Sequence, residues 1–293
     1  MSVKSCNFAG ELSNWNTMKK FLLSIFTVLC TASMYAVSLN GVEYTIDTLS
    51  MYPVGPGTTY YELRFLRADN GKGRMDAFLI AVDTRNPYVH VEQVLGTGKI
   101  IGTERPSKMA ERSTTENKIF FAGSNGDFFV TQGDVGLPVS TTIVNNEYAH
   151  TPVANRTARR LGAIDADGRG ATAYRHSISM KLLVGDQTLE IAHANYKRAE
   201  NELVLYNHHN GATTATNAYG TEVQIQLLDG QSWNTTGLMK AKVTKVEEQV
   251  GSMALDKDHA VLSGHGTMAA ELNKLKVGDA ISLDFEIRFD DEL

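Results

Sequence analysis

Residues 60–67 read Tyr60-Tyr61-Glu62-Leu63-Arg64-Phe65-Leu66-Arg67, so charged and apolar side chains alternate along most of the stretch. This alternation is typical of a β-strand that buries one face. Residues 75–82, Met75-Asp76-Ala77-Phe78-Leu79-Ile80-Ala81-Val82, predict a more buried strand. The residues between them, Asp69-Asn70-Gly71-Lys72-Gly73, tolerate positive φ and predict a hairpin. The N-terminal region is therefore expected to be mainly antiparallel sheet.

The period-two pattern continues toward the C-terminus, interrupted by two helix signals. Helices are predicted at 106–112, where Pro106 stands in the first turn, and at 268–275. Further strands are predicted at 88–95, 118–123, 141–144, 161–164, 177–184, 188–191, 203–206, 222–228, 241–246 and 281–289. The expected fold class is α+β and β-rich, with mainly antiparallel or mixed sheets and a few short helices.

Composition excludes several classes of protein. The 293 residues are 42% hydrophobic and 21% charged, which is typical of a globular chain with a sizeable core. The formal net charge of -5 provides no broad cationic field, so nucleic acid is not an expected partner. One domain is expected over 37–293, with a β-rich insertion possible at about 175–262.

The N-terminal segment has the pattern of an export signal. Residues 18–36 begin with Met18 and two lysines, continue with an apolar run at 21–29 and end in small residues before Ala36. Residues 1–17 then read as an upstream artefact. A bilayer span needs about 20 apolar residues, so no integral membrane span is expected after cleavage. The protein is predicted to be exported, to the periplasm or beyond.

Cysteine usage agrees with that reading. Cleavage after Ala36 removes both Cys6 and Cys30, so the mature chain forms no disulfide and its core holds by packing. Lipoprotein anchoring at Cys30 is the less favoured alternative, because Leu29 before it is not small.

The strongest local signal for chemistry lies at 120–129, which reads Phe120-Phe121-Ala122-Gly123-Ser124-Asn125-Gly126-Asp127-Phe128-Phe129. Short polar residues after a strand lie at a sheet rim, and the two phenylalanines that follow can pin the turn to the core. Asp127 then stands on rigid support. An ordinary β-turn, which favours the same residue types, remains the competing interpretation.

The order of several strings resembles the phosphodiester glycosidase domain. The strings are Asn125-Gly126-Asp127-Phe128-Phe129, Gly136-Leu137-Pro138, the Asn-x-Glu end at Asn145-Asn146-Glu147, and residues 161–168, with similar stretches at 200–206, 216–223 and 261–266. That family includes the enzyme that uncovers mannose 6-phosphate by removing N-acetylglucosamine. The resemblance implies hydrolysis of the bond between a sugar's anomeric carbon and a phosphate oxygen, with a phosphorylated sugar or glycan as the partner.

The implied reaction needs a carboxylate and donors for the phosphate. Asp127 is the first candidate carboxylate and Glu147 the second, with Asn125 and Gly126 at the sugar or phosphate. The remaining candidates are three arginines for the phosphate and one histidine between glycines: Arg105, Arg159, Arg160 and His265. Solvated arginines and a structural histidine are the alternatives.

No metal or cofactor is predicted. The sequence contains no His-Glu-x-x-His, Cys-x-x-Cys, Gly-x-Ser-x-Gly or phosphate-loop motif. His208 and His209 are neighbours, and on a strand their side chains would point to opposite faces and make a poor joint metal site.

Family members carry further downstream motifs, of which His-Pro-Arg-Thr-like and Asp-Gly-Gly-Gly-Ser-like strings do not occur here, whereas an Asp-Gly-Arg string does occur, at Asp167-Gly168-Arg169. The chain is therefore expected to be a fragment or a shortened relative, with unpaired sheet edges and low stability. A non-catalytic glycan-binding or cell-surface module is the alternative function. The sequence predicts neither the sugar nor the oligomeric state.

Overall fold

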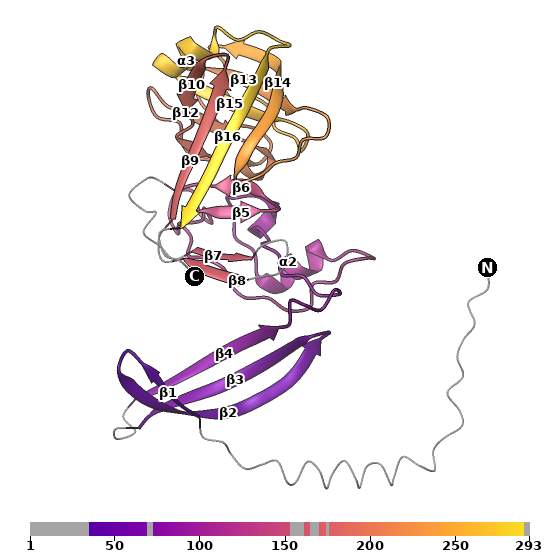
Figure 1. Ribbon diagram of the computed structural model, residues 1–293, viewed down its shortest axis with the longest axis vertical. Coiled ribbons are helices and arrows are strands. Elements are labelled where there is room, and N and C mark those ends of the chain that lie inside the picture. The colour runs from indigo at the N-terminus through magenta and orange to yellow at the C-terminus, as the bar shows by residue number, and fades with distance from the viewer. Residues whose placement is uncertain (1–34, 69–72, 153–160, 165–169, 174–175, 290–293) are drawn as a thin grey trace, which may run out of the picture. The chain divides into compact units, whose positions relative to one another are not determined.

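The computed structural model describes residues 35–68, 73–152, 161–164, 170–173 and 176–289 (Figure 1). The chain divides into two compact units. The first comprises the residues up to Pro53 and Thr59–Ala81, and the second comprises Val54–Thr58 and Val82–Leu293.

The first unit is built on a sheet of four strands in the order β1-β2-β3-β4. Their bounds are Tyr35–Leu39, Val42–Gly55, Thr58–Arg67 and Arg74–Val82. β1 and β2 are antiparallel and joined through Asn40 and Gly41, whose φ angles of 51° and 77° suit a tight primed turn. The strands predicted at 60–67 and 75–82 are confirmed, but the burial expected of the second is wrong, because Phe78 is 65% exposed and Leu79 is 47% exposed in β4. The predicted turn residues 69–72 lie outside the described residues, and the expected cleavage after Ala36 falls inside β1.

The second unit contains a sheet of eight strands in the order β10-β9-β16-β14-β13-β15-β12-β11. The strands are β9 (His176–Val184), β10 (Gln187–Glu190), β11 (His193–Ala194), β12 (Leu203–Tyr206), β13 (Gly220–Leu227), β14 (Gly237–Glu248), β15 (Ala260–His265) and β16 (Ala280–Phe289). Neighbours are antiparallel except β11 and β12, which are parallel. The predicted β-rich class is confirmed. The sheet runs from residue 176 to 289, beyond the stretch 175–262 considered as an insertion.

The hydrophobic core of the second unit is formed by every second side chain along its strands. Along β14, Met239, Ala241 and Val243 are buried, while Lys240 and Lys242 between them are exposed. Side chains from the other strands join the same cluster, as does Leu272 of helix α3 (Thr267–Leu272). Burying one large aliphatic side chain stabilises a fold by about 1.5–3 kcal/mol, so this cluster is the main source of stability in the second unit.

Shorter elements complete the second unit. They are the 3-10 turns η1 (Gly96–Gly98) and η3 (His208–Asn210), helix α2 (Pro106–Ser113), and the two-stranded pairs β5–β6 (Thr142–Val144 and Glu147–His150) and β7–β8 (Leu161–Ile164 and Gly170–Ala173). Asn145 and Asn146 join β5 to β6 with φ angles of 50° and 66°.

Among the described residues, none of the helices combines the length and apolar character that crossing a bilayer requires.

Two predicted strands are wrong. Residues 88–95 and 118–123 form loops, and Lys118 contributes only a single bridge to Thr115. The run at 88–95 alternates in part and the run at 118–123 is apolar after Lys118, yet Val91 is 45% exposed and Ile119 is 68% exposed. A strand needs a neighbouring strand to satisfy its backbone, and the period alone does not provide one. The second predicted helix also ends earlier, at Leu272.

Candidate functional site

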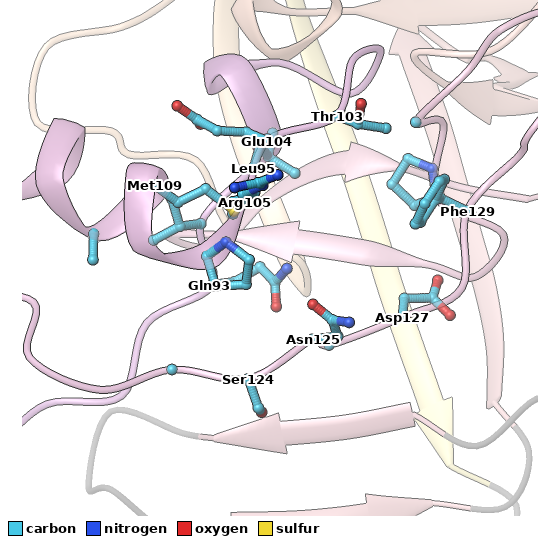
Figure 2. Close-up of a pocket in the computed structure, with 18 of the residues that line it drawn as sticks. Gln93, Leu95, Thr103, Glu104, Arg105, Met109, Ser124, Asn125, Asp127 and Phe129 are labelled. Carbon is cyan, nitrogen blue, oxygen red and sulfur yellow. The ribbon is translucent and has the colours of Figure 1, made fainter.

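A cavity of about 790 Å³ lies among the loops that precede the eight-stranded sheet in the chain, and Figure 2 shows part of its lining. Its walls come from three segments, between residues 92 and 110, 120 and 129, and 136 and 138. Four of the predicted site residues line it: Arg105, Asn125, Gly126 and Asp127. Residues about 20 positions apart in sequence are thus brought together.

The segment that carries Asn125 and Asp127 is irregular and exposed. Figure 2 shows these two side chains on the same side of the segment and Ser124 on the other side, as alternation along an extended backbone requires. Gly126 stands between them, and a Cβ there would come within 3.3 Å of Oε1 of Gln93. Glycine therefore leaves room for the Gln93 side chain, which lines the same cavity.

Asp127 is held in place by its own loop. Its Oδ1 accepts a hydrogen bond from the backbone N–H of Phe128 at 2.7 Å, and its Oδ2 accepts one from the N–H of Ser140 at 2.8 Å. The loop is further closed by the N–H of Val139, which donates to the carbonyl of Phe128 at 3.0 Å. The Ser140 hydroxyl also donates to Oδ1, at 3.4 Å. Because each carboxylate oxygen accepts two hydrogen bonds, Oδ2 keeps the remaining acceptor capacity.

Arg105 precedes helix α2, whose first residue is Pro106. Its side chain is exposed and makes no ion pair or hydrogen bond with the residues that the structure describes. Two acids that line the cavity are paired elsewhere. Glu104 binds Arg112 at 2.9 Å, and Glu92 binds Lys118 at 2.9 Å. The charge of Arg105 is therefore available to an anion in the cavity.

The hydrogen bonds from Arg112 lower the pKa of Glu104, and the backbone N–H of Thr97 acts in the same direction. Arg112 also donates to the carbonyl of Leu95 at 2.8 Å. This arginine thus ties α2 to the 95–97 turn on the cavity wall.

The other predicted residues do not join this cavity. Glu147 begins β6 and lines a second cavity of about 420 Å³. His265 ends β15 opposite Gly220 and lines neither cavity. A Cβ on Gly264 would lie 2.8 Å from the backbone of Met268, so the glycine admits another backbone. Arg159 and Arg160 lie outside the described residues.

Sequence reasoning missed a cluster around Glu147. His208 and His209 lie on the 3-10 turn η3, not on a strand, so the expectation that they face apart is wrong. The Asn207 side chain accepts a hydrogen bond from the backbone N–H of His209 at 3.2 Å and starts the turn. Asn207 before the pair and Gly211 after it are turn residues, and this is the signal that could have revealed the turn.

The titratable groups of this cluster are perturbed by burial. Burial raises the pKa of Glu147 to about 7 and lowers that of His209 to about 4. The positive charge of Lys257 lowers the pKa of both histidines further. His150, at the other end of β6, has its pKa lowered to about 4 by burial, which the hydrogen bond with the Asn195 carbonyl and, to a smaller extent, the negative charge of Asp127 partly offset.

Comparisons with known proteins identify a fold likeness alone. No known protein family matches the chain, and no curated protein does. The structure is similar to that of a putative exported protein from Burkholderia pseudomallei K96243, with a TM-score of 0.53 and 14% identity over 88% of this chain and 71% of that one. A hypothetical protein from Synechocystis matches at a TM-score of 0.47 and 13% identity, over 89% of this chain and 42% of that one.

Proposed function

We propose that this chain belongs to an exported hydrolase of sugar phosphodiesters, which cleaves the bond between an anomeric carbon and a phosphate oxygen in a substrate of the N-acetylglucosamine-phosphate type. One observation carries the proposal: Arg105 and the Asn125–Asp127 segment line a single cavity. Export is supported by the signal-like segment 18–36 and by the similar fold of the Burkholderia exported protein.

The charges suit a phosphorylated sugar. A guanidinium binds two phosphate oxygens at once, and Arg105 has no acidic partner among the described residues. It also stands at the N-terminal end of α2, where the helix dipole favours an anion. A volume of about 790 Å³ is within the range of about 300–1,000 Å³ that small-ligand sites occupy.

The chemistry assigns a role to each polar group. A phosphate monoester leaves without full protonation, so the reaction depends on a carboxylate that orients water or stabilises an oxocarbenium-like centre. Asp127 supplies that carboxylate, and its three loop hydrogen bonds hold it in one orientation. The Asn125 side chain lies on the same side of the segment as Asp127, and in this proposal its amide binds a sugar hydroxyl or a phosphate oxygen.

A second candidate function is glycan binding without turnover. Both carboxylate oxygens of Asp127 already accept hydrogen bonds from their own loop, as expected of a positioning residue. Phe128 is 76% exposed and Phe129 is 48% exposed, and both line the cavity. Exposed aromatic rings around a polar centre mark a binding surface. The two candidates share the cavity and differ in whether product appears.

The test measures free N-acetylglucosamine released from an N-acetylglucosamine-phospho-mannose substrate by the full chain. We expect Asp127→Asn to slow release by about 100-fold or more, as loss of a positioned acid–base group does. Arg105→Gln should act mainly through KM, because its contact is with the bound phosphate. Asp186→Asn, at an exposed turn outside the cavity, is the matched control and should match the wild type.

Equal release rates for the wild type and Asp127→Asn would show that Asp127 is not the catalytic carboxylate, and no release by the wild type would remove the hydrolase assignment. Saturable binding of the substrate without release would establish the glycan-binding candidate in its place. Loss of that binding in Arg105→Gln would then locate the ligand in the same cavity.

A further inference from the structure

Away from the first cavity, one carboxylate faces two imidazoles. The ligating atoms of Glu147, His208 and His209 all lie within 4.8 Å of one another. We propose that these three side chains bind a first-row transition-metal dication of the zinc class, with a fourth position left for water. This inference is independent of the sugar phosphodiester activity.

The spacing fits a metal better than direct hydrogen bonds. Oε2 of Glu147 lies 3.5 Å from Nδ1 of His208 and 3.6 Å from Nε2 of His209. A direct N–H···O hydrogen bond spans about 2.7–3.2 Å, so both pairs are too far apart. Ligands about 2.0–2.1 Å from a tetrahedral zinc stand about 3.3 Å from one another. The observed separations are close to that value.

His209 provides a second, independent observation. The residue is only 6% exposed, and its Nε2 has no hydrogen-bond partner among the described residues. A buried polar atom without a partner costs about 1–3 kcal/mol, so native proteins rarely leave one unsatisfied. That atom lies 3.6 Å from the Glu147 carboxylate, and a shared cation would satisfy both groups.

The framework that carries the three ligands is buried and hydrogen-bonded. Asn207, just before the histidines, donates through its Nδ2 to the carbonyl of Tyr148, just after Glu147, at 3.1 Å. Asn195 donates through its Nδ2 to the carbonyl of Ala149 at 2.9 Å and accepts from the N–H of Asn207 at 2.9 Å. The backbone of β6 and the start of η3 are thus held together before any ion binds, as a pre-organised metal site requires.

The donor set selects the class of metal. Two imidazole nitrogens and one carboxylate oxygen are the ligands of open zinc sites, whereas calcium and magnesium prefer oxygen alone. Glu147 lines the second cavity, so water can reach the open position. Lys257 lines that cavity too, and its positive charge opposes a cation there. Removing that charge should therefore tighten metal binding.

The experiment titrates zinc chloride into the untagged full chain by calorimetry. Every sample carries Cys6→Ser and Cys30→Ser, because thiolates would bind zinc independently. We expect a single zinc per chain, weakened by more than about 10-fold in Glu147→Gln and in His209→Gln. Lys257→Gln should bind more tightly. His259→Gln is the matched control, because its ring pairs with Asp256 at 2.9 Å outside the cluster.

A replacement variant and the ligand atoms around the bound zinc keep the test decisive if a variant fails to fold. If circular dichroism shows that Glu147→Gln or His209→Gln has lost structure, His208→Gln replaces it, since that ring is 24% exposed. X-ray absorption of the zinc-loaded parent should show imidazole nitrogens and a carboxylate oxygen at about 2.0–2.2 Å. The absence of saturable binding, equal affinity in the ligand variants, or a shell without imidazole would overturn the proposal.

Discussion

The eight-stranded sheet and the loop-rich segment 82–141 belong to the same unit but hold their side chains differently. In the sheet, Leu262 and Leu283 are 0% exposed. In the loop segment, Ile119 is 68% exposed, and Asp127 is fixed by individual hydrogen bonds to its own loop. Stability is therefore concentrated in the sheet, while the candidate site lies on a loop-rich segment with a smaller buried cluster, as expected of functional loops.

The sharpest test of that contrast removes apolar volume from the sheet. Leu262→Ala should lower the free energy of unfolding by about 2–5 kcal/mol, because it leaves a cavity in a fully packed cluster. Ile119→Ala in the loop segment should change it by no more than about 0.5 kcal/mol. Urea denaturation of both variants measures the difference. If Ile119→Ala lowered the free energy of unfolding as much as Leu262→Ala, stability would not be concentrated in the sheet.

A second test measures how stability depends on pH through His150, which lies after the loop segment and before the sheet in the chain. The folded-state pKa of His150 is about 4, below its ordinary value of 6.5, so the unfolded chain takes up the proton first. Stability should therefore fall as pH drops from about 6.5 to 4, by about 2–3 kcal/mol from this group. His150→Gln should flatten that part of the profile in denaturation series. Parallel profiles for the two proteins would contradict the assignment.

A substitution in the loop segment should weaken hydrogen bonds only near the substituted residue, whereas a substitution in the sheet should destabilise the whole unit. Asp127→Asn replaces a charged acceptor of the Ser140 and Phe128 N–H groups, and should cost about 0.5–1.5 kcal/mol. Hydrogen exchange at the Ser140 amide should quicken, while amides of the sheet keep their protection. Uniform loss of protection across the unit would show that the loop is coupled to the core.

The smallest effect is expected on the cavity wall. Arg112→Gln removes the ion pair with Glu104, whose side chains are 40% and 18% exposed, and should cost about 0.2–1 kcal/mol, less at high salt. Thermal melts at low and high salt measure it. A loss that does not diminish with salt would assign the effect to the Arg112 hydrogen bond with the Leu95 carbonyl.

Sequence periodicity predicted the sheet well because each strand there has a neighbour. The strand predicted at 203–206 matches β12, and that at 281–289 matches β16 within one residue. The strand prediction failed at 118–123, where an apolar run follows Lys118 but no partner strand lies beside it among the described residues. Pairing depends on distant residues, which a local period does not encode.

The candidate site was predictable only in part, for a related reason. The Asn125–Asp127 turn is a local signal, and its meeting with Arg105 in one cavity depends on how the loops fold. The approach of Glu147 to His208 and His209 depends on the turn at Asn207 and on buried hydrogen bonds between β6 and that turn. A strand at that position would have separated the two rings.

The most direct test is to locate the phosphorylated sugar on the protein. A crystal structure of the full chain with N-acetylglucosamine 1-phosphate should place the phosphate within hydrogen-bond reach of the Arg105 guanidinium and the sugar beside Asn125 and Asp127. The cavity that these residues line would then be the binding site. Ligand density elsewhere on the protein, with this cavity left to solvent at saturating ligand, would contradict the central claim.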